Sequence, residues 1–218
     1  MRLRVFQAPM NTEILKILAD DVCEGAIHLL GATLRWGDLA AEVVETEAYR
    51  GGDDRACHAT LFPNMRNRVM HGPPGFAYVY FTYGNHFMLN VSALPDGQAG
   101  AILIRAARPI SGLAEMHARR AVKPAKRPRT DRDLLSGPGK LAQAFGIRAA
   151  QNGQFLFDGD GLHLEVAEPL VRPPHRVGTR IGISAGNCED WPWRFIADAN
   201  ADWASRPHLP PTDHGPSR

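Results

Sequence analysis

The chain has 218 residues, of which 44% are hydrophobic and 22% are charged, and its formal net charge is +2 at pH 7. This composition is typical of a globular protein with a sizeable core, built as one domain or a tight pair of domains. No apolar run approaches the roughly 20 residues of a membrane-spanning helix, and the first residues lack the apolar core of a signal peptide. We therefore expect a cytoplasmic protein without a membrane segment.

The cysteines and histidines give no sign of a metal site. Cys23, Cys57 and Cys188 are odd in number, widely spaced and contain no Cys-x-x-Cys pair. This spacing argues against a disulfide framework and against a thiolate metal site. The nine histidines are scattered without His-x-x-x-His or mixed Cys/His spacing, so no metal is predicted.

The first third of the chain leads from a helix to an acidic strand. Apolar periodicity predicts a helix over residues 11–30, broken near Asp20-Asp21, then a short strand at residues 32–35. The next strand contains Glu45-Thr46-Glu47-Ala48-Tyr49, and the alternation of a strand places its two glutamates and its tyrosine on one face. Two carboxylates beside an aromatic ring form a candidate catalytic arrangement.

A long loop and a hairpin follow this strand. Residues 51–75 are rich in Gly, Pro, Asp and Arg, lack sustained periodicity, and carry His58 and Arg66-Asn67-Arg68. Long loops inside a compact domain are usually functional. An aromatic strand at residues 78–83 then enters a glycine turn, and Asn90 lies on the strand that returns.

The middle of the chain is basic. A buried strand at residues 101–105 ends in an arginine, and a helix is predicted at residues 111–120 with Ser111 as its cap. Residues 119–132 carry many lysines and arginines against the single acid Asp131. Such a run is either a solvated surface loop or a surface for an anionic partner.

A second candidate anion site lies at Ser136-Gly137-Pro138-Gly139-Lys140. A capping box is predicted at residues 130–133, just before this motif. The motif opens a predicted helix, where free backbone N–H groups, glycines and a lysine can hold a phosphate. It is not a Walker A loop, because the Gly-x-x-x-x-Gly-Lys spacing is absent.

The last third of the chain reads mainly as short strands. They are predicted at residues 155–157, 162–166, 180–183 and 193–196. The Pro, His and Ser content beyond Arg206 predicts a disordered tail at residues 207–218, which leaves residues 1–206 as a single domain.

As an ordered set, these motifs resemble the alkyladenine DNA glycosylase family, also called 3-methyladenine DNA glycosylases. The match covers roughly residues 26–195, and it is specific because its motifs occur in order, although each alone is weak. The motifs are Glu45-Thr46-Glu47-Ala48-Tyr49, Ala56-Cys57-His58, Arg66-Asn67-Arg68, Tyr78-Val79-Tyr80, Tyr83-Gly84, Asn90, Leu103-Ile104-Arg105, Ser136-Gly137-Pro138-Gly139-Lys140 and Arg180-Ile181-Gly182-Ile183.

The resemblance implies an α+β fold with a curved, mainly antiparallel, open-barrel-like sheet and helices on its outside. It also implies a monofunctional enzyme that flips an alkylated or deaminated purine out of duplex DNA and hydrolyses its N-glycosidic bond. We expect a monomer without a cofactor, associated with the nucleoid in a bacterial cell. The matched catalytic positions contain no lysine, which argues against a Schiff-base lyase step.

The resemblance assigns two catalytic residues. Glu47 matches the general base, and Arg105 matches the position that helps to hold the attacking water. A carboxylate can deprotonate water and stabilise an oxocarbenium-like state. Because an alkylated purine is already cationic and leaves readily, one carboxylate can suffice, so Glu45 is expected to be a structural neighbour.

The resemblance also assigns the base pocket. Aromatic side chains can stack on a flipped purine, and Asn90 is expected to screen purines by crowding the guanine amino group. The main chain of Ile181 is expected to help hold the water, although Arg176-Val177-Gly178 is a rival alignment. The expected pocket residues are Tyr49, His58, Tyr80, Asn90 and Ile181.

The resemblance also implies two kinds of contact with the duplex, one from a side chain inserted into the DNA and one from a basic surface. Tyr83 matches the side chain that enters the minor groove and fills the space of the flipped nucleotide. Backbone contacts would position the duplex. The expected DNA-binding residues are Tyr83, Asn85, Arg66, Arg68, Arg120, Ser136, Gly137 and Lys140.

The chain departs from the family pattern at Pro63-Asn64-Met65, His71 and Asn85-His86. These departures leave the preferred lesion open. Two other functions also stay open on the sequence: a nucleic-acid binding module without catalysis, and an RNA-directed enzyme that uses the basic surface.

Overall fold

The strands form one sheet whose described pairings are all antiparallel. The computed structural model describes residues 12–61, 65–82, 84–122, 127–206 and 208–209. The sheet has the strand order β3-β4-β5-β2-β1-β6, and β8 joins it by pairing with both β2 and β7. The strands are β1 (Thr33–Trp36), β2 (Leu39–Arg50), β3 (Ala77–Thr82), β4 (His86–Ser92), β5 (Gly100–Ser111), β6 (His163–Glu165), β7 (His175–Gly178) and β8 (Arg194–Ala197).

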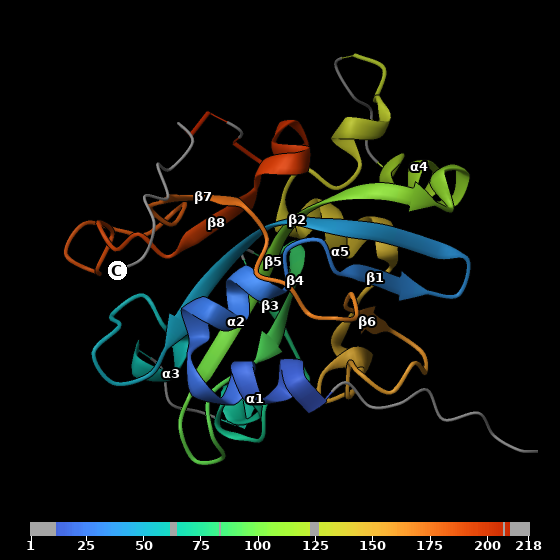
Figure 1. Ribbon diagram of the computed structural model, residues 1–218. Helices are drawn as coiled ribbons and strands as arrows, with labels where there is room; N and C mark the ends of the chain where they lie inside the picture. The colour runs from blue at the N-terminus through green and yellow to red at the C-terminus, as the bar shows by residue number, and fades with distance from the viewer. Residues whose placement is uncertain (1–11, 62–64, 83, 123–126, 207, 210–218) are drawn as a thin grey trace, which may run out of the picture.

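The helices pack around this curled sheet. Figure 1 shows α1 and α2 below the long strands and α4 above them. Helix α2 contacts β2 and β5, whereas α5 contacts β4 and β5. The helices are α1 (Thr12–Asp20), α2 (Val22–His28), α3 (His58–Leu61), α4 (Leu113–Arg120) and α5 (Pro138–Phe145), with 3-10 turns η1 (Met65–His71), η2 (Asp131–Asp133), η3 (Ala149–Gln151) and η4 (Asp198–Trp203). The predicted α+β class with a curved antiparallel sheet is confirmed.

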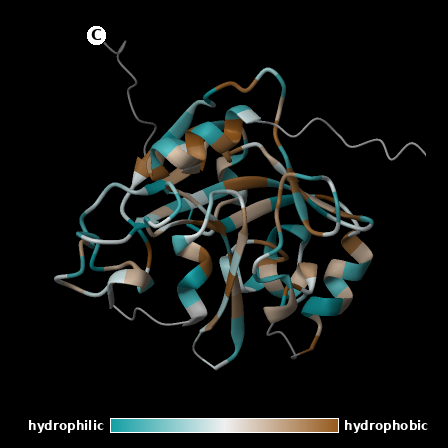
Figure 2. Cartoon of the chain, turned by 90° about the horizontal axis from the view of Figure 1, so that it is seen from below, coloured by the Kyte–Doolittle hydropathy of each residue, from teal (hydrophilic) through white to brown (hydrophobic). Residues whose placement is uncertain are grey.

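The helices are amphipathic, and their apolar sides complete the core. Figure 2 shows both hydrophilic and hydrophobic residues along the helices. In α1, Ile14 and Leu18 are fully buried. The predicted break between α1 and α2 is confirmed, because the Asp21 carboxylate caps α2 by accepting from the backbone N–H groups of Cys23 and Glu24 at 2.6 and 2.9 Å.

Strand β2 lies at the centre of the sheet and buries its acids. Around Glu45 to Glu47 it pairs with β5 on one side and with β8 on the other, and the β5 pairing is irregular there. Thr46 points toward α2 and donates a hydrogen bond to the Ala26 carbonyl at 2.9 Å. The two glutamates lie on the other face, as the alternation predicts.

Several predicted elements differ from the structure. The loop at residues 51–75 contains α3 and η1, and β5 continues past Arg105 to Ser111. Ser111 does not cap α4, because it is the last residue of β5 and its hydroxyl donates to the Asp38 carbonyl at 2.7 Å. Gly112 holds the cap position instead, with a φ of 76° that favours glycine.

Two of the four strands predicted in the last third are wrong. Residues 155–157 make only an isolated bridge between Phe155 and Phe76, and residues 180–183 form no strand. Leu156 is fully buried and Phe157 nearly so, so this apolar run reflects packing rather than strand pairing. The capping box at Thr130 and Asp133 is present.

The ends of the chain lie largely outside the described residues. The predicted tail at residues 207–218 is described only at His208 and Leu209, and Leu209 packs against a small apolar cluster of Ile196, Ala201 and Ala204. Disorder of the rest of the tail stays a prediction. None of the described helices is long and apolar enough to span a membrane.

Candidate active site

The predicted catalytic and substrate-binding residues converge on one cavity of about 380 Å³. All of them except Glu47 line it, and Glu47 hydrogen-bonds to residues of its wall. The walls come from β2, β3, β4, β5, the start of α3 and the loop before it, η1, the start of α5 and the irregular segment at residues 181–187. The lining residues predicted from sequence are Tyr49, His58, Tyr80, Asn90, Arg105 and Ile181.

Glu47 is fully buried and receives donors on both carboxylate oxygens. Its Oε2 accepts from the Tyr49 hydroxyl at 2.7 Å and from Arg105 Nη1 at 3.1 Å, and its Oε1 accepts from the Ile181 backbone N–H at 2.7 Å. Burial raises the pKa of Glu47, while the Arg105 charge and the hydrogen bonds from Tyr49 and Ile181 oppose that rise. The donors from Tyr49, Arg105 and Ile181 therefore orient the Glu47 carboxylate and favour its ionised form.

Glu45 is also buried, but neither of its hydrogen-bond donors lines the cavity. Its Oε1 accepts from Arg194 Nη1 at 3.1 Å and its Oε2 from the Ser205 backbone N–H at 2.8 Å. Arg105 lies between the two acids, with its Nε 3.7 Å from Glu45 Oε1. Glu45 thus braces Arg105 and the C-terminal segment, as a structural neighbour would.

An aromatic wall, formed by His58, Tyr78 and Tyr80, lines the cavity. The Tyr78 and Tyr80 rings stack with centroids 5.5 Å apart, and the His58 ring meets Tyr80 edge-on at 4.5 Å. His58 Nδ1 lies 3.3 Å from the Tyr78 hydroxyl, and burial lowers the pKa of His58. A lowered pKa keeps the imidazole neutral at pH 7. Tyr78 was not predicted to line the cavity, yet the Tyr-x-Tyr spacing on a strand places it on the same face as Tyr80.

Asn90 lines the cavity from the neighbouring strand. It lies opposite Tyr78 in the β3–β4 ladder, is 3% exposed, and donates from Nδ2 to the Tyr78 carbonyl at 3.0 Å. The short amide is thereby fixed in orientation at the cavity edge.

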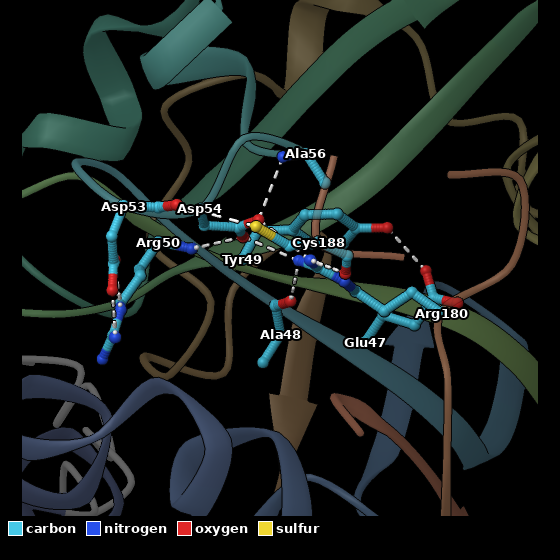
Figure 3. A network of polar contacts seen from close by, with 9 residues as sticks. All are labelled: Glu47, Ala48, Tyr49, Arg50, Asp53, Asp54, Ala56, Arg180 and Cys188. Carbon is cyan, nitrogen blue, oxygen red and sulfur yellow. Dashed lines mark hydrogen bonds and ion pairs between the residues drawn. The ribbon is translucent and has the colours of Figure 1, made fainter. Parts of the chain in front are cut away.

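Ile181 reaches Glu47 from a segment that has no ladder pairing. Of the two rival alignments, the structure brings Arg180-Ile181-Gly182 to the cavity, while Arg176 lies in β7 and pairs with Asp198 at 3.0 Å. Arg180 is bound by Asp54, and Figure 3 shows this pair beside Glu47 and Tyr49. No role was predicted for either residue, although Arg180 stands inside a recognised motif.

Five of the predicted DNA-binding residues lie near the hairpin or the start of α5, namely Asn85, Arg120, Ser136, Gly137 and Lys140. Asn85 and Arg120 line a groove of about 930 Å³, and the described residues that line it include no carboxylate. Gly137 occupies the N-cap position of α5, and Lys140 Nζ donates to Ser136 Oγ at 2.9 Å. Burial lowers the pKa of Lys140, and the nearby Arg120 charge lowers it further.

Three other predicted DNA contacts are only partly described. Arg68 is exposed on η1, and Arg66 belongs to the same turn, although its side chain lies outside the described part of the chain. Tyr83 also lies outside the described residues. In the described ranges, no three His, Cys, Asp or Glu side chains are grouped so that they could hold a metal ion.

The cavity residues and the motifs that carry them also mark a family. Residues 16–201 match the family model described as methylpurine-DNA glycosylase (MPG). A Rhodopseudomonas palustris protein is 46% identical over 177 residues, which are 81% of this chain and 80% of the relative. A Nocardia farcinica protein is 43% identical over 185 residues, covering 82% of this chain and 84% of the relative. Both carry the name "Putative 3-methyladenine DNA glycosylase".

The chain therefore belongs to the methylpurine-DNA glycosylase family. The family resemblance in the sequence motifs is confirmed.

Proposed function

We propose that this protein is a monofunctional glycosylase that flips an alkylated or deaminated purine out of duplex DNA and hydrolyses its N-glycosidic bond. Membership of the family supports a DNA glycosylase for alkylated bases. The observation that carries the mechanism is Glu47, a buried carboxylate oriented by donors at the wall of an aromatic cavity.

The cavity suits a flat, electron-poor base. Tyr49, His58 and Tyr80 offer ring surfaces, and aromatic faces attract a cationic ring such as an alkylated purine. Extrusion of a base costs a few kcal/mol and is easiest for damaged, poorly paired bases. The fixed Asn90 amide would crowd a substituent at the purine edge and so screen against guanine.

Glu47 Oε1 is the oxygen that we expect to activate water. Each carboxylate oxygen offers two lone-pair sites. The Tyr49 hydroxyl and Arg105 occupy those of Oε2, whereas the Ile181 amide takes one of those of Oε1. The second lone pair of Oε1 can accept a proton from water, while the negative charge stabilises the positive sugar in the transition state.

For an alkylated purine, the cationic leaving group makes a second catalytic acid unnecessary. The Arg105 guanidinium would hold and orient the water beside the carboxylate, and the positive charge of an alkylated purine is neutralised as the base departs. The neutral His58 then serves as a pocket contact rather than as a proton donor. Action as a monomer is part of this proposal.

The duplex would lie over the hairpin and the start of α5. Tyr83 would enter the minor groove, and the basic and amide groups around it would hold the backbone. These contacts are proposed for Asn85, Arg66, Arg68, Arg120, Ser136, Gly137 and Lys140.

The test is base release from duplexes that contain one lesion, measured under single-turnover conditions as free base and abasic sites. Glu47→Gln should lower release by at least about a hundredfold, because removing a catalytic base forfeits a factor of roughly 10² to 10⁴, while lesion binding persists. The matched control is Glu165→Gln, which should keep full activity. Glu165 lies on β6 and forms an exposed ion pair with Arg35.

The alternatives give different results. A binding module would hold the lesion duplex but release no base even as wild type. An RNA-directed enzyme would act on the same lesion in RNA and leave DNA untouched. Either outcome would refute the proposal.

A further inference from the structure

We infer that the buried ion pair of Asp54 and Arg180 is a positioning element for Glu47, because it fixes the segment whose Ile181 amide binds the carboxylate. This inference rests on the proposed function, since it assigns the pair a part in water activation by Glu47.

The pair is bidentate and fully enclosed. Arg180 Nη1 and Nη2 donate to Asp54 Oδ2 and Oδ1 at 2.6 and 2.9 Å, and both side chains are 0% exposed. The same nitrogens also donate to the carbonyls of Ala48 and Cys188 at 3.1 and 3.2 Å. Figure 3 shows the guanidinium at the centre of this network. Because the guanidinium is planar, these four hydrogen bonds hold it in a single orientation.

Asp54 connects the pair to two other walls of the site. Its Oδ2 accepts from the Arg50 backbone N–H at 3.2 Å, at the end of β2, and its Oδ1 accepts from the Ala56 backbone N–H at 3.0 Å. Ala56 lines the cavity and precedes His58 by two residues. The Asp54 carboxylate therefore connects the end of β2, the loop before α3 and the segment that contains Ile181.

Arg180 controls two of the three donors on Glu47. Ile181 follows it in the chain, and the Tyr49 ring lies under its guanidinium, with Cζ 4.7 Å from the ring centroid. The third donor, Arg105, comes from β5 and is independent of this pair. Displacement of Arg180 would therefore shift the Tyr49 hydroxyl and the Ile181 amide together.

The Ile181 segment needs side-chain contacts to keep its position. Residues 179–188 belong to no strand or helix, so no backbone ladder holds the Ile181 amide against β2. Before it, Arg194 Nε donates to the Thr179 carbonyl at 2.7 Å. After it, the Cys188 carbonyl is held by Arg180 itself. A buried ion pair adds little to the stability of a fold by itself. Here it supplies the positional constraint that no backbone ladder gives to the Ile181 segment.

The experiment compares Arg180→Lys and Asp54→Asn with two control variants from an exposed pair that does not line the cavity, Arg35→Lys and Glu165→Gln. Lysine keeps the charge but cannot form the bidentate fork. We expect single-turnover base release by both test variants to fall roughly 10- to 100-fold, the loss given by one hydrogen bond to a charged group. Binding of the lesion duplex should change by less than about threefold, and the controls should match wild type.

The pH profile separates positioning from simple loss of structure. The charged and titratable groups that face Glu47 are Arg105 from β5, Glu45 and Tyr49 from β2, and Arg180 from the irregular segment. The Tyr49 and Ile181 hydrogen bonds favour the anion. Their displacement should move the acidic limb of base release to higher pH in the test variants, with no movement in the controls.

A readout without activity is the ¹⁵N–¹H signal of the Ile181 amide. In wild type this signal should titrate with Glu47, and in Arg180→Lys the titration should be lost. Asp54→Glu, which keeps the charge but shifts its position, covers the case in which Asp54→Asn does not fold; it should give an intermediate loss of rate.

Folded test variants that release base within threefold of wild type and keep the Ile181 titration would overturn the inference. Failure of the wild type to release any base would refute the proposed function instead, and the amide signal would still report whether the pair positions Ile181.

Discussion

At the scale of single residues, the two acids of β2 have different environments although both are buried. Glu45 is bound by Arg194 and the Ser205 amide, while Glu47 is bound by groups that line the cavity. Alternation along the strand predicted their shared face. Apart from Tyr49, which lies two positions from Glu47, their partners come from segments 58 to 160 positions away, which local sequence patterns do not place.

Tyr49 combines a ring that can stack on a base with a hydroxyl that serves Glu47. Tyr49→Phe keeps the ring and removes the donor to Oε2. Because that hydrogen bond lowers the pKa of Glu47, its loss should raise this pKa. The base must be ionised, so base release should fall about 3- to 30-fold near the acidic limb, and the limb should move to higher pH.

Tyr49→Leu provides the comparison, because it removes the ring as well and should weaken lesion binding in addition. Single-turnover rates from pH 5 to 9, with binding measured at each pH, check both variants. A Tyr49→Phe profile that superimposes on wild type would show that the hydroxyl does not tune Glu47.

At the scale of elements, local signals predicted the hairpin, the broken first helix and the helix that opens at Pro138. Each has a short-range cause, namely strand alternation, an Asp cap, and a Gly-Pro helix start. The prediction of a strand at residues 180–183 is wrong because the run Arg-Ile-Gly-Ile has the composition of a strand. In the structure, Arg180 instead forms a buried ion pair and the Ile181 amide binds a carboxylate. Motifs could predict the residues that surround the cavity, but they could not predict the Asp54 partner of Arg180.

The start of α5 packs so closely on the hairpin that Gly139 has no room for a side chain. A Cβ at this position would lie 2.8 Å from His86 Cγ and 3.1 Å from His86 Cβ. Gly139→Ala should therefore push the hairpin away, lower the free energy of unfolding by about 1–3 kcal/mol and weaken duplex binding.

Gly72→Ala is the matched control, because its Cβ would meet only the Val69 carbonyl, at an ordinary 3.5 Å. Denaturant unfolding gives the stability change, and titration with a lesion duplex gives the affinity. Equal stability of the two variants would mean that the hairpin does not rest on α5 as tightly as the packing indicates.

At the scale of the whole molecule, one hairpin separates the cavity from the basic groove. Tyr80 and Met88 line the cavity, while the adjacent Phe81 and Phe87 line the groove. The start of α5 is shared in the same way, since Pro138 lines the cavity and Gly139 the groove. The net charge of +2 does not predict that basic residues gather along this groove, because charge composition carries no information about which face a cation occupies.

Arg120 and Lys140 should account for part of the salt dependence of duplex binding. Arg120 lines the groove beside Arg129, and burial together with that neighbouring charge lowers the pKa of Arg120. A phosphate would relieve the mutual repulsion of such cations. If each side chain neutralises one phosphate, Arg120→Ala and Lys140→Ala should each reduce the slope of log K against log salt by about 0.9.

The matched control is Arg35→Ala, since Arg35 lies on β1 and pairs with Glu165 at 2.6 Å. Affinity for an undamaged duplex and for a lesion duplex, measured between about 50 and 200 mM salt, gives the slopes. Both duplexes should weaken equally, because phosphate contacts position the DNA without reading the base. A variant that loses lesion preference while keeping its slope would instead place Arg120 or Lys140 at the flipped base, so the two measurements together decide what each cation binds.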